Sequence, residues 1–391
     1  MPNPTATSGT AGSGTAVAPQ PGHAKGGNAA PPPLAPFTSG AHEHVEGPFS
    51  DVSTQIGASA VAVGPVSVPA YGYLRDIILH VAATGGADSG ETVAAVGDAP
   101  WCALQNIQFT DVNGAPIVGP FTSAYALYLI NKYGGYQWSA DPNLSPSFSA
   151  VAVGSNASGN FSFLIRIPAE IVSRDALGAL PNQNAASTYK IQYTVAASSS
   201  IYSTPPDTLP IVRVRMYLEA WSQPLPTTPQ GMPQATVPPA LGTTQYWSMF
   251  NSPAASGQQT ILLPRVGNLI RRLIFVSRDS SGVRLSSNGF PDPATFLWDT
   301  RILLQASQAV FKEWMFNWYG YGLGSSSLDN GVFVIDFAHD LTGKAGEELR
   351  DQYLPTTQAT RLELQGVFGS SSSSLDVITN DIAPTGDIQV H

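Results

Sequence analysis

Two stretches of the chain share one pattern, and this repetition constrains the fold more than any other feature. The first is VSVPAYGYLRDIILHV, from Val66 to Val81, and the second is ILLPRVGNLIRRLIFV, from Ile261 to Val276, about 195 residues later. In each, an apolar run closes at a proline, a glycine follows three residues on, and an arginine stands near the start of a second apolar run. The matching residues are Pro69 and Pro264, Gly72 and Gly267, and Arg75 and Arg271.

The features that follow these stretches recur in the same order. CALQNIQFTDVNGAPIV holds two strand-like runs around Asn113-Gly114, a dipeptide that favours a tight hairpin, and FLWDTRILLQASQAVF repeats strand, turn and strand. Each half then has an aromatic segment ending in Tyr-Gly, an apolar strand, a short charged helical stretch, a Leu-Pro pair, an alternating strand and a closing strand. This order predicts an internal duplication.

Composition and length favour an all-β chain with two domains. Charged residues make up 12% of the 391 residues, whereas 37 Gly and 33 Pro supply many turns. We expect an all-β fold of two consecutive eight-stranded antiparallel jelly rolls, with short helices in loops and an extended N-terminal arm. The expected parts are the arm at residues 1–48, the first jelly roll at 49–221, a Pro-rich linker at 222–245 and the second jelly roll at 246–391.

The arm has two interpretations. Its Gly, Ala, Pro, Ser and Thr residues cannot form a core, so it is either a disordered tail or a segment that becomes ordered against neighbouring subunits. We expect the second. The arm carries Lys25 as its one basic side chain other than histidine, so it is not a basic genome-binding arm. The whole chain has a formal net charge of −9, which disfavours direct nucleic-acid binding.

The residues with a reactive side chain do not form a recognisable catalytic or metal-binding motif. Cys102 is the single cysteine, and its apolar surroundings indicate a core residue rather than a nucleophile. His42-Glu43-His44 has ligand-like spacing, but it lies in the expected arm, where no second shell would hold it. His80 is expected on a strand.

A second group surrounds His339. Asp336 and Asp340 could act as acid and base, but they lie where a strand is expected to run into a helix, and Asp340 is better interpreted as an N-terminal cap. We therefore predict no catalytic, cofactor-binding or metal-binding residues, and no cofactor. The first residues also lack the charged and apolar regions of a signal peptide.

An enzyme that processes glycans remains an alternative, because paired jelly rolls with exposed tryptophans and carboxylates can bind sugars. Candidate tryptophans are Trp101, Trp138, Trp298, Trp314 and Trp318. The last three fall in strand-like runs, which favours core packing. A cluster of them on one rim beside two carboxylates would support an enzyme. A phage spike or tail adhesion module is a further alternative, although the in-chain duplication favours a shell.

With these repeats, its linker and its arm, the chain from about Phe49 onwards resembles the double jelly-roll major capsid proteins of tailless double-stranded DNA viruses, notably tectivirus-like bacteriophages of the PRD1-adenovirus lineage. The resemblance implies a structural protein without catalysis, whose pseudo-hexagonal homotrimers tile an icosahedral virion shell assembled in the host cytoplasm. Its implied partners are neighbouring trimers, minor capsid or penton proteins and an internal membrane. Three loops are candidates for an outward turret, at residues 84–98, 140–159 and 277–293.

Overall fold

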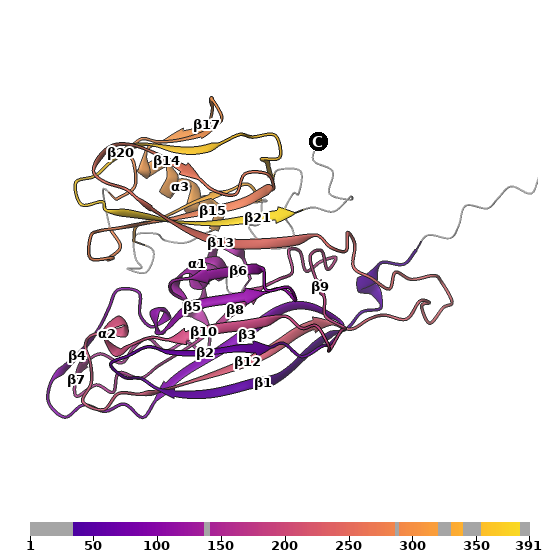
Figure 1. Cartoon of the computed structure of the whole chain (residues 1–391), viewed down its shortest axis with the longest axis horizontal. Helices are drawn as coiled ribbons and strands as arrows, with labels where there is room; N and C mark the ends of the chain where they lie inside the picture. The colour runs from indigo at the N-terminus through magenta and orange to yellow at the C-terminus, as the bar shows by residue number, and fades with distance from the viewer. Residues whose placement is uncertain (1–33, 137–140, 286–288, 320–329, 339–352, 384–391) are drawn as a thin grey trace, which may run out of the picture. The chain divides into compact units, whose positions relative to one another are not determined.

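The computed structural model of the chain describes residues 34–136, 141–285, 289–319, 330–338 and 353–383. These residues belong to one compact unit. They form two β-sandwiches, the first coloured indigo to magenta and the second coloured salmon to yellow in Figure 1. We call them the first and the second half.

The first half is a sandwich of two antiparallel sheets. One sheet has the order β1-β12-β3-β8, with the short β9 paired to β3, and the other contains β2-β10-β5-β6. The bounds are β1 Glu43–Gln55, β12 Ile211–Trp221, β3 Tyr73–Thr84, β8 Phe161–Pro168, β9 Leu180–Pro181, β2 Val61–Ser67, β10 Lys190–Val195, β5 Leu104–Thr110 and β6 Pro116–Phe121.

The second half repeats this arrangement strand by strand. Its sheets have the orders β13-β21-β15-β18, with β19 paired to β15, and β14-β20-β16-β17. The bounds are β13 Thr244–Pro253, β21 Ser374–Ala383, β15 Leu269–Arg278, β18 Val332–Asp336, β19 Leu354–Pro355, β14 Gly257–Leu263, β20 Leu362–Phe368, β16 Ala294–Trp298 and β17 Arg301–Ala306. Two eight-stranded jelly rolls with the same strand order confirm the predicted fold class.

The sequence landmarks take matching places in the two halves. Arg75 lies at a bulge of β3 where β12 has no partner for it, and Arg271 lies at the same bulge of β15 against β21. Each Leu-Pro pair forms a two-residue strand that pairs with the start of the strand that carries the bulge. Leu180-Pro181 pairs with β3, and Leu354-Pro355 pairs with β15. The predicted Asn113-Gly114 hairpin joins β5 to β6, and Gly114 has the positive φ of 87° that such a turn requires.

Short elements fill the connections. The helices are α1 Tyr125–Gly134, α2 Ser198–Ile201 and α3 Gln308–Tyr319, and the 3₁₀ turns are η1 Phe37–Ser39, η2 Trp101–Ala103 and η3 Pro142–Leu144. A small separate sheet contains β4 Thr92–Ala95, β7 Gly154–Ser155 and β11 Tyr202–Thr204. The helices α1 and α3 occupy the same connection in the two halves, after β6 and after β17.

Period-two burial explains why the strands form where they do. In β8 the residues Phe161, Phe163, Ile165 and Ile167 are buried while the intervening residues are half-buried, so one face of the strand supplies the core. Strand β12 alternates in the same way. The strands β15, β18 and β21 are instead buried along almost their whole length, which shows that their sheet is covered on both faces.

Two expectations about helices were wrong. The charged stretch after β8 is not helical: it turns back on itself through an isolated bridge between Val172 and Leu177, because Ala176 and Gly178 have the positive φ values of 62° and 81°. Trp314 and Trp318 lie on helix α3 and not on a strand. Their spacing of four residues, which stacks the two rings 6.1 Å apart, belongs to a helical period.

The division into four parts stays a prediction. Strand β1 begins at Glu43, inside the range expected for the arm, and β13 begins at Thr244, at the end of the expected linker. Among residues 222–243 the chain forms isolated bridges, at Thr227 and Gln234, but no named helix or strand.

Strand β20 allows a matched test of this core. Leu364→Ala removes a fully buried side chain, and we expect it to lower the free energy of unfolding by about 2–5 kcal/mol. Val367→Ala on the same strand truncates a side chain that is 50% exposed, and we expect a change within about 0.5 kcal/mol. Urea unfolding followed by circular dichroism measures both. Equal losses for the two variants would contradict the assigned faces of β20.

Candidate functional site: the junction and the free edges of the two halves

The two halves share one sheet. Strand β13 of the second half lies parallel to β6 of the first half, with Trp247 opposite Val118. This contact joins the β13-β21-β15-β18 sheet to the β2-β10-β5-β6 sheet, so that nine strands including β19 form a continuous sheet. We call the contact between β6 and α1 of the first half and the β13-β21-β15-β18 sheet of the second half the junction.

Helix α1 fills the space above this shared sheet. All ten of its residues are buried. On the second half, Ile274 of β15, Val334 of β18 and Ile378 of β21 belong to the same hydrophobic cluster as α1 and the first-half core. Both faces of the β13-β21-β15-β18 sheet are therefore buried because, at the junction, the first half covers its outer face.

A buried polar network crosses the junction. The guanidinium of Arg271, which is fully buried, donates from Nη1 to the hydroxyl of Tyr136 at 2.8 Å, and that hydroxyl donates to Oε1 of Gln245 at 3.0 Å. Oε1 of Gln245 also accepts from Nδ2 of Asn380 at 3.2 Å, and its Nε2 donates to the carbonyl of Glu170 at 2.7 Å. Buried polar groups cost free energy unless they are paired, so this network favours one arrangement of the two halves.

The corresponding arginine of the first half has a different environment. Arg75 pairs with Glu170 at 2.9 Å and with Glu43 at 2.9 Å, and its guanidinium lies 4.4 Å from the ring centroid of Trp221. Burial raises the pKa of Glu170 to about 7 against the opposing effect of Arg75. The two copies of the bulge arginine thus stabilise different contacts, one inside the first half and one across the junction.

The three predicted turret loops come together. Strand β4 in the loop at 84–98 pairs with β7 in the loop at 140–159. Asp98, at the end of the first loop, forms ion pairs with Arg278 at 2.9 Å and Arg284 at 2.6 Å, both in the loop at 277–293. Loops from both halves therefore lie at one end of the sandwiches, where β4 and β7 are drawn in Figure 1.

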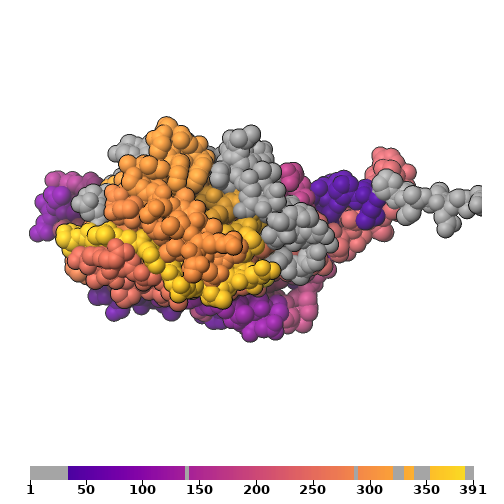
Figure 2. Space-filling view, turned by 90° about the horizontal axis from the view of Figure 1, so that it is seen from above, coloured from indigo at the N-terminus to yellow at the C-terminus, as the bar shows by residue number. Residues whose placement is uncertain are grey.

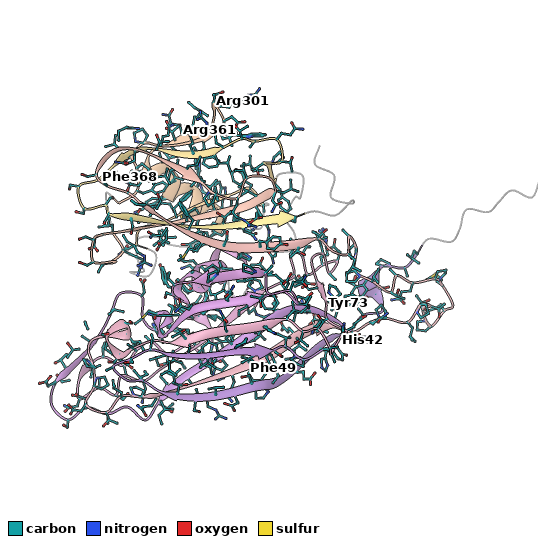
Figure 3. The ribbon with its side chains drawn as sticks, in the orientation of Figure 1. His42, Phe49, Tyr73, Arg301, Arg361 and Phe368 are labelled. Atoms are coloured by element: carbon teal, nitrogen blue, oxygen red, sulfur yellow. The ribbon has the colours of Figure 1, made fainter. Side chains whose placement is uncertain are left out.

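Several outermost strands carry exposed apolar side chains, among them β1 and β17, and also β2 with Val61 and β14 with Leu262. In their sheets, β1 pairs only with β12 and β17 pairs only with β16 among the strands of the described residues. Val45 of β1 is 58% exposed, and Ile302 of β17 is 59% exposed. Figure 3 labels Arg301 at the start of β17 and His42 just before β1. The free edge of β17, where Ile302 and Leu303 are exposed, favours association with another strand, whereas β1 also carries Glu43, Glu46 and Pro48, residue types that protect an edge.

The candidate reactive residues of the sequence do not lie together in one site. Cys102 is buried in η2, and burial raises the pKa of its thiol to about 12. His44 stacks on Tyr71 with centroids 4.1 Å apart, while Glu43 pairs with Arg75. Within the described ranges, no group of three or more His, Cys, Asp or Glu residues could hold a metal ion.

His80 and Asp336 both lie on strands, and each contacts the side chain of an arginine on a neighbouring strand. His80 is on β3, as expected, 2.7 Å from Nη2 of Arg215, and burial followed by the charge of Arg215 lowers the pKa of its imidazole. Asp336 ends β18, where it pairs with Arg272 at 2.9 Å and accepts a hydrogen bond from the hydroxyl of Tyr319 at 2.6 Å. His339 and Asp340 lie outside the described residues, so the expected cap is not tested.

The tryptophans do not form an exposed rim in the part of the chain that the structure describes. Trp101 is fully buried, whereas Trp298, Trp314 and Trp318 are half-buried. Trp138 lies outside the described residues. Trp101 stacks on Tyr128 at 4.9 Å, which places it in the first-half core.

Sequence reasoning missed most of the junction. Gln245 is the last residue of the expected linker. Tyr136 ends the first aromatic segment, residues 125–136, for which the sequence indicates no role. Arg271 was a landmark of the repeat, but its contacts could not be inferred because they come from the other half. None of the described helices has the length and the apolar composition needed to cross a lipid bilayer.

The network gives a matched test with two conservative substitutions. Tyr136→Phe removes the hydroxyl that links Arg271 to Gln245, and we expect it to lower the free energy of unfolding by about 1–3 kcal/mol. Tyr193→Phe removes a buried hydroxyl with no hydrogen-bond partner among the described residues, and we expect no loss. Chemical denaturation compares the two, and an equal effect would show that the network does not stabilise the junction.

Comparison with known proteins places this fold. No protein-family model matches the chain, and no curated protein matches its sequence. Among solved structures, the chain is similar to the crystal structure of the STIV major capsid protein, with a TM-score of 0.58 and 11% identity, over 88% of this chain and 97% of that one. The atomic structure of Sulfolobus Turreted Icosahedral Virus gives a TM-score of 0.57 at 11% identity, over 88% of this chain and 91% of the other.

A third similar structure is PBCV-1 VP54, fitted into a reconstruction of the virophage Sputnik, with a TM-score of 0.50 at 10% identity, over 88% of this chain and 94% of that one. The similarity covers both halves of this chain and almost the whole of the other chains. The chain therefore has the double jelly-roll fold that these major capsid proteins of icosahedral viruses share.

Proposed function

We propose that this chain is a structural major capsid protein, whose copies form pseudo-hexagonal trimers that tile an icosahedral virion shell. It acts through its surfaces and catalyses no reaction. Its partners are other copies of itself, within a trimer and between trimers, and its place is the virion after assembly in the host cytoplasm.

The similarity of fold over nearly the whole length of the STIV protein carries this proposal. The match spans 88% of this chain and 97% of that one, so it takes in both jelly rolls and not one sandwich alone. A single jelly roll occurs in proteins with many functions, but a fused pair with corresponding strand orders has the geometry of a repeated building block.

The fused pair explains how a trimer could have a hexagonal outline. Each chain supplies two similar sandwiches that are held together by the shared sheet and the covering helix α1. A closed ring of three chains then contains six similar sandwiches, so it meets its neighbours through nearly equivalent sides. The net charge of −9 fits a shell that does not bind its genome through its own surface.

The native mass tests this proposal first. We expect the purified protein to have a mass of about three chains by light scattering, as a closed cyclic assembly requires, and negative-stain images of the same fraction to show particles with a hexagonal outline. A well-behaved monomer that binds or cleaves a glycan would overturn the proposal in favour of the glycan-active alternative.

The arm provides a separate prediction about the contacts between trimers. Deleting residues 1–33 leaves the bridge between Ala35 and Gln234 and the buried Phe37 in place. We expect the shortened protein to form trimers of normal mass but to assemble poorly into shells, because the arm is proposed to lie on neighbouring subunits. A variant with a scrambled arm of equal composition is the control. Shells from the shortened protein as abundant as those from the full chain would exclude this role.

A further inference from the structure

The junction inside one chain is a contact between one side of a sandwich and the opposite side of the next. The first half contributes β6 and the helix that follows it, and the second half contributes β13 and the outer face of its sheet. In the second half the strand that corresponds to β6 is β17, and in the first half the strand that corresponds to β13 is β1. Both β17 and β1 are outermost strands of their sheets, as Figure 1 shows.

We propose that β17 of one copy pairs in parallel with β1 of a second copy, and that helix α3 covers the outer face of the second copy's first-half sheet, so that the contact between copies repeats the junction within the chain. This inference rests on the proposed function, because it names the surfaces that build the proposed trimer. It follows from the strand pairings and exposures of this chain.

Strand pairing identifies the residue of β1 that takes the place of Trp247. Trp247 is opposite the same residue of β21 as Arg272, and Val45 is opposite the same residue of β12 as Asp76. Arg272 and Asp76 each directly follow the arginine at the bulge. Trp247 and Val45 therefore occupy corresponding positions. Trp247 is 1% exposed at the junction, whereas Val45 is 58% exposed. The position of Trp247 is therefore covered in the second half, whereas the corresponding position of Val45 in the first half is uncovered.

The same reasoning identifies the partner position on β17. Val118 of β6 is paired with the buried Phe109, and Leu304 of β17 is paired with the buried Phe296 at the corresponding place. The contact between Trp247 and Val118 thus corresponds to one between Val45 and Leu304. Beside these positions, Ile117 of β6 is 4% exposed while Leu303 of β17 is 38% exposed.

The helices show the same difference. Helix α1 is buried along its whole length, but on the corresponding α3 Val310 is 42% and Phe316 is 48% exposed. In the space-filling view of Figure 2, orange atoms of the second half lie on the viewed face. An apolar helix side and an apolar strand edge that lie next to each other form one continuous patch for a partner.

The proposed landing face on the second copy combines apolar side chains with a paired charge. Ile274, Val334 and Ile378, which lie against α1 in the second half, correspond to Ile78, Arg166 and Tyr217 on the first-half sheet. Ile78 and Tyr217 are half-buried, and Arg166 is paired with Asp76 and Glu219 of the same sheet. Helix α3 would therefore cover a face whose charged side chains already have partners.

Charge also favours this pairing over an association of like edges. Strand β17 starts with the exposed Arg301, whereas β1 carries Glu43 and Glu46, whose side chains are 66% and 51% exposed. Two copies of β17, or two copies of β1, would bring like charges together. Opposite charges on the two edges orient the encounter, although each exposed pair adds little stability.

Because β17 and β1 lie on different halves, the contact is head to tail. Such heterologous contacts close into a ring when the rotation between copies allows it. The partner is therefore a second copy of this chain, and each copy of the ring uses both surfaces at once.

Disulfide trapping tests the register directly. Neighbouring strands lie about 4.8 Å apart, within the Cα separation of about 4.4–6.8 Å that a disulfide requires. The full chain would carry Val45→Cys together with Leu304→Cys, and copper phenanthroline in air would oxidise the thiols. The buried Cys102 stays in place, and the matched control carries Val61→Cys with Leu262→Cys on β2 and β14, at positions that are 43% and 59% exposed.

We expect most of the Val45/Leu304 variant to migrate as covalent dimers and closed trimers on a denaturing gel, to return to monomer with reductant, and to exceed the control pair by at least about tenfold, as specific strand contact requires. Trimers by light scattering without this cross-link would overturn the inference and leave the proposed function standing. Equal cross-linking of both pairs would show random collision and would also overturn it. A monomer without cross-links would overturn both proposals.

Discussion

The burial of Arg271 between the two halves is the constraint on which the rest of the structure depends. A fully buried guanidinium is stable only where its donors find acceptors, and here Tyr136 comes from the first half and Asn380 from the second. The halves must therefore meet in one orientation for the charge to be accommodated. With β13 paired to β6, this joins the two sandwiches through one continuous sheet.

The duplicated halves differ where they meet. The bulge that displaces Arg75 and Arg271 is the same in both copies, but Arg75 binds Glu170 and Glu43 within its own half. Likewise, the second-half sheet is covered by α1 while the matching first-half sheet keeps a half-buried outer face. The strand framework is the same in both halves, and side chains that face another sandwich are among the differences.

The sequence was sufficient for the framework because its information is local. Proline, glycine and arginine at fixed spacing, the Leu-Pro pairs and the Asn113-Gly114 turn each act within a few residues, and the structure places them at corresponding points of the two halves. Helix α3 was missed because Trp314 and Trp318 lie in a run of aromatic residues that favours a strand on propensity alone. The turn near Ala176 was not predicted, because the residue types in this stretch do not indicate the positive φ value of an alanine.

The candidate site was harder to predict, because its contacts connect residues more than a hundred positions apart. Gln245 had the composition of a linker residue, yet its amide lies between Asn380 and the backbone of Glu170. Val45 stands in the segment expected to be an arm and Ile302 in an expected strand, and neither sequence pattern indicates the edge of a sheet. Only pairing the two halves residue by residue separates the covered edges from the free ones.

The loops that cluster around β4 and β7 contain positions with free space beside the backbone. The added Cβ of a side chain at Gly90 or Gly97 would meet no atom within 4 Å. Side chains added at these two positions would therefore change the chemistry of the surface without disturbing the packing of the sandwiches, whereas a Cβ at Gly86 in the same loop would clash with the carbonyl oxygen of Ser158. The open part of this end is thus where a new surface property could be introduced at the least cost in stability.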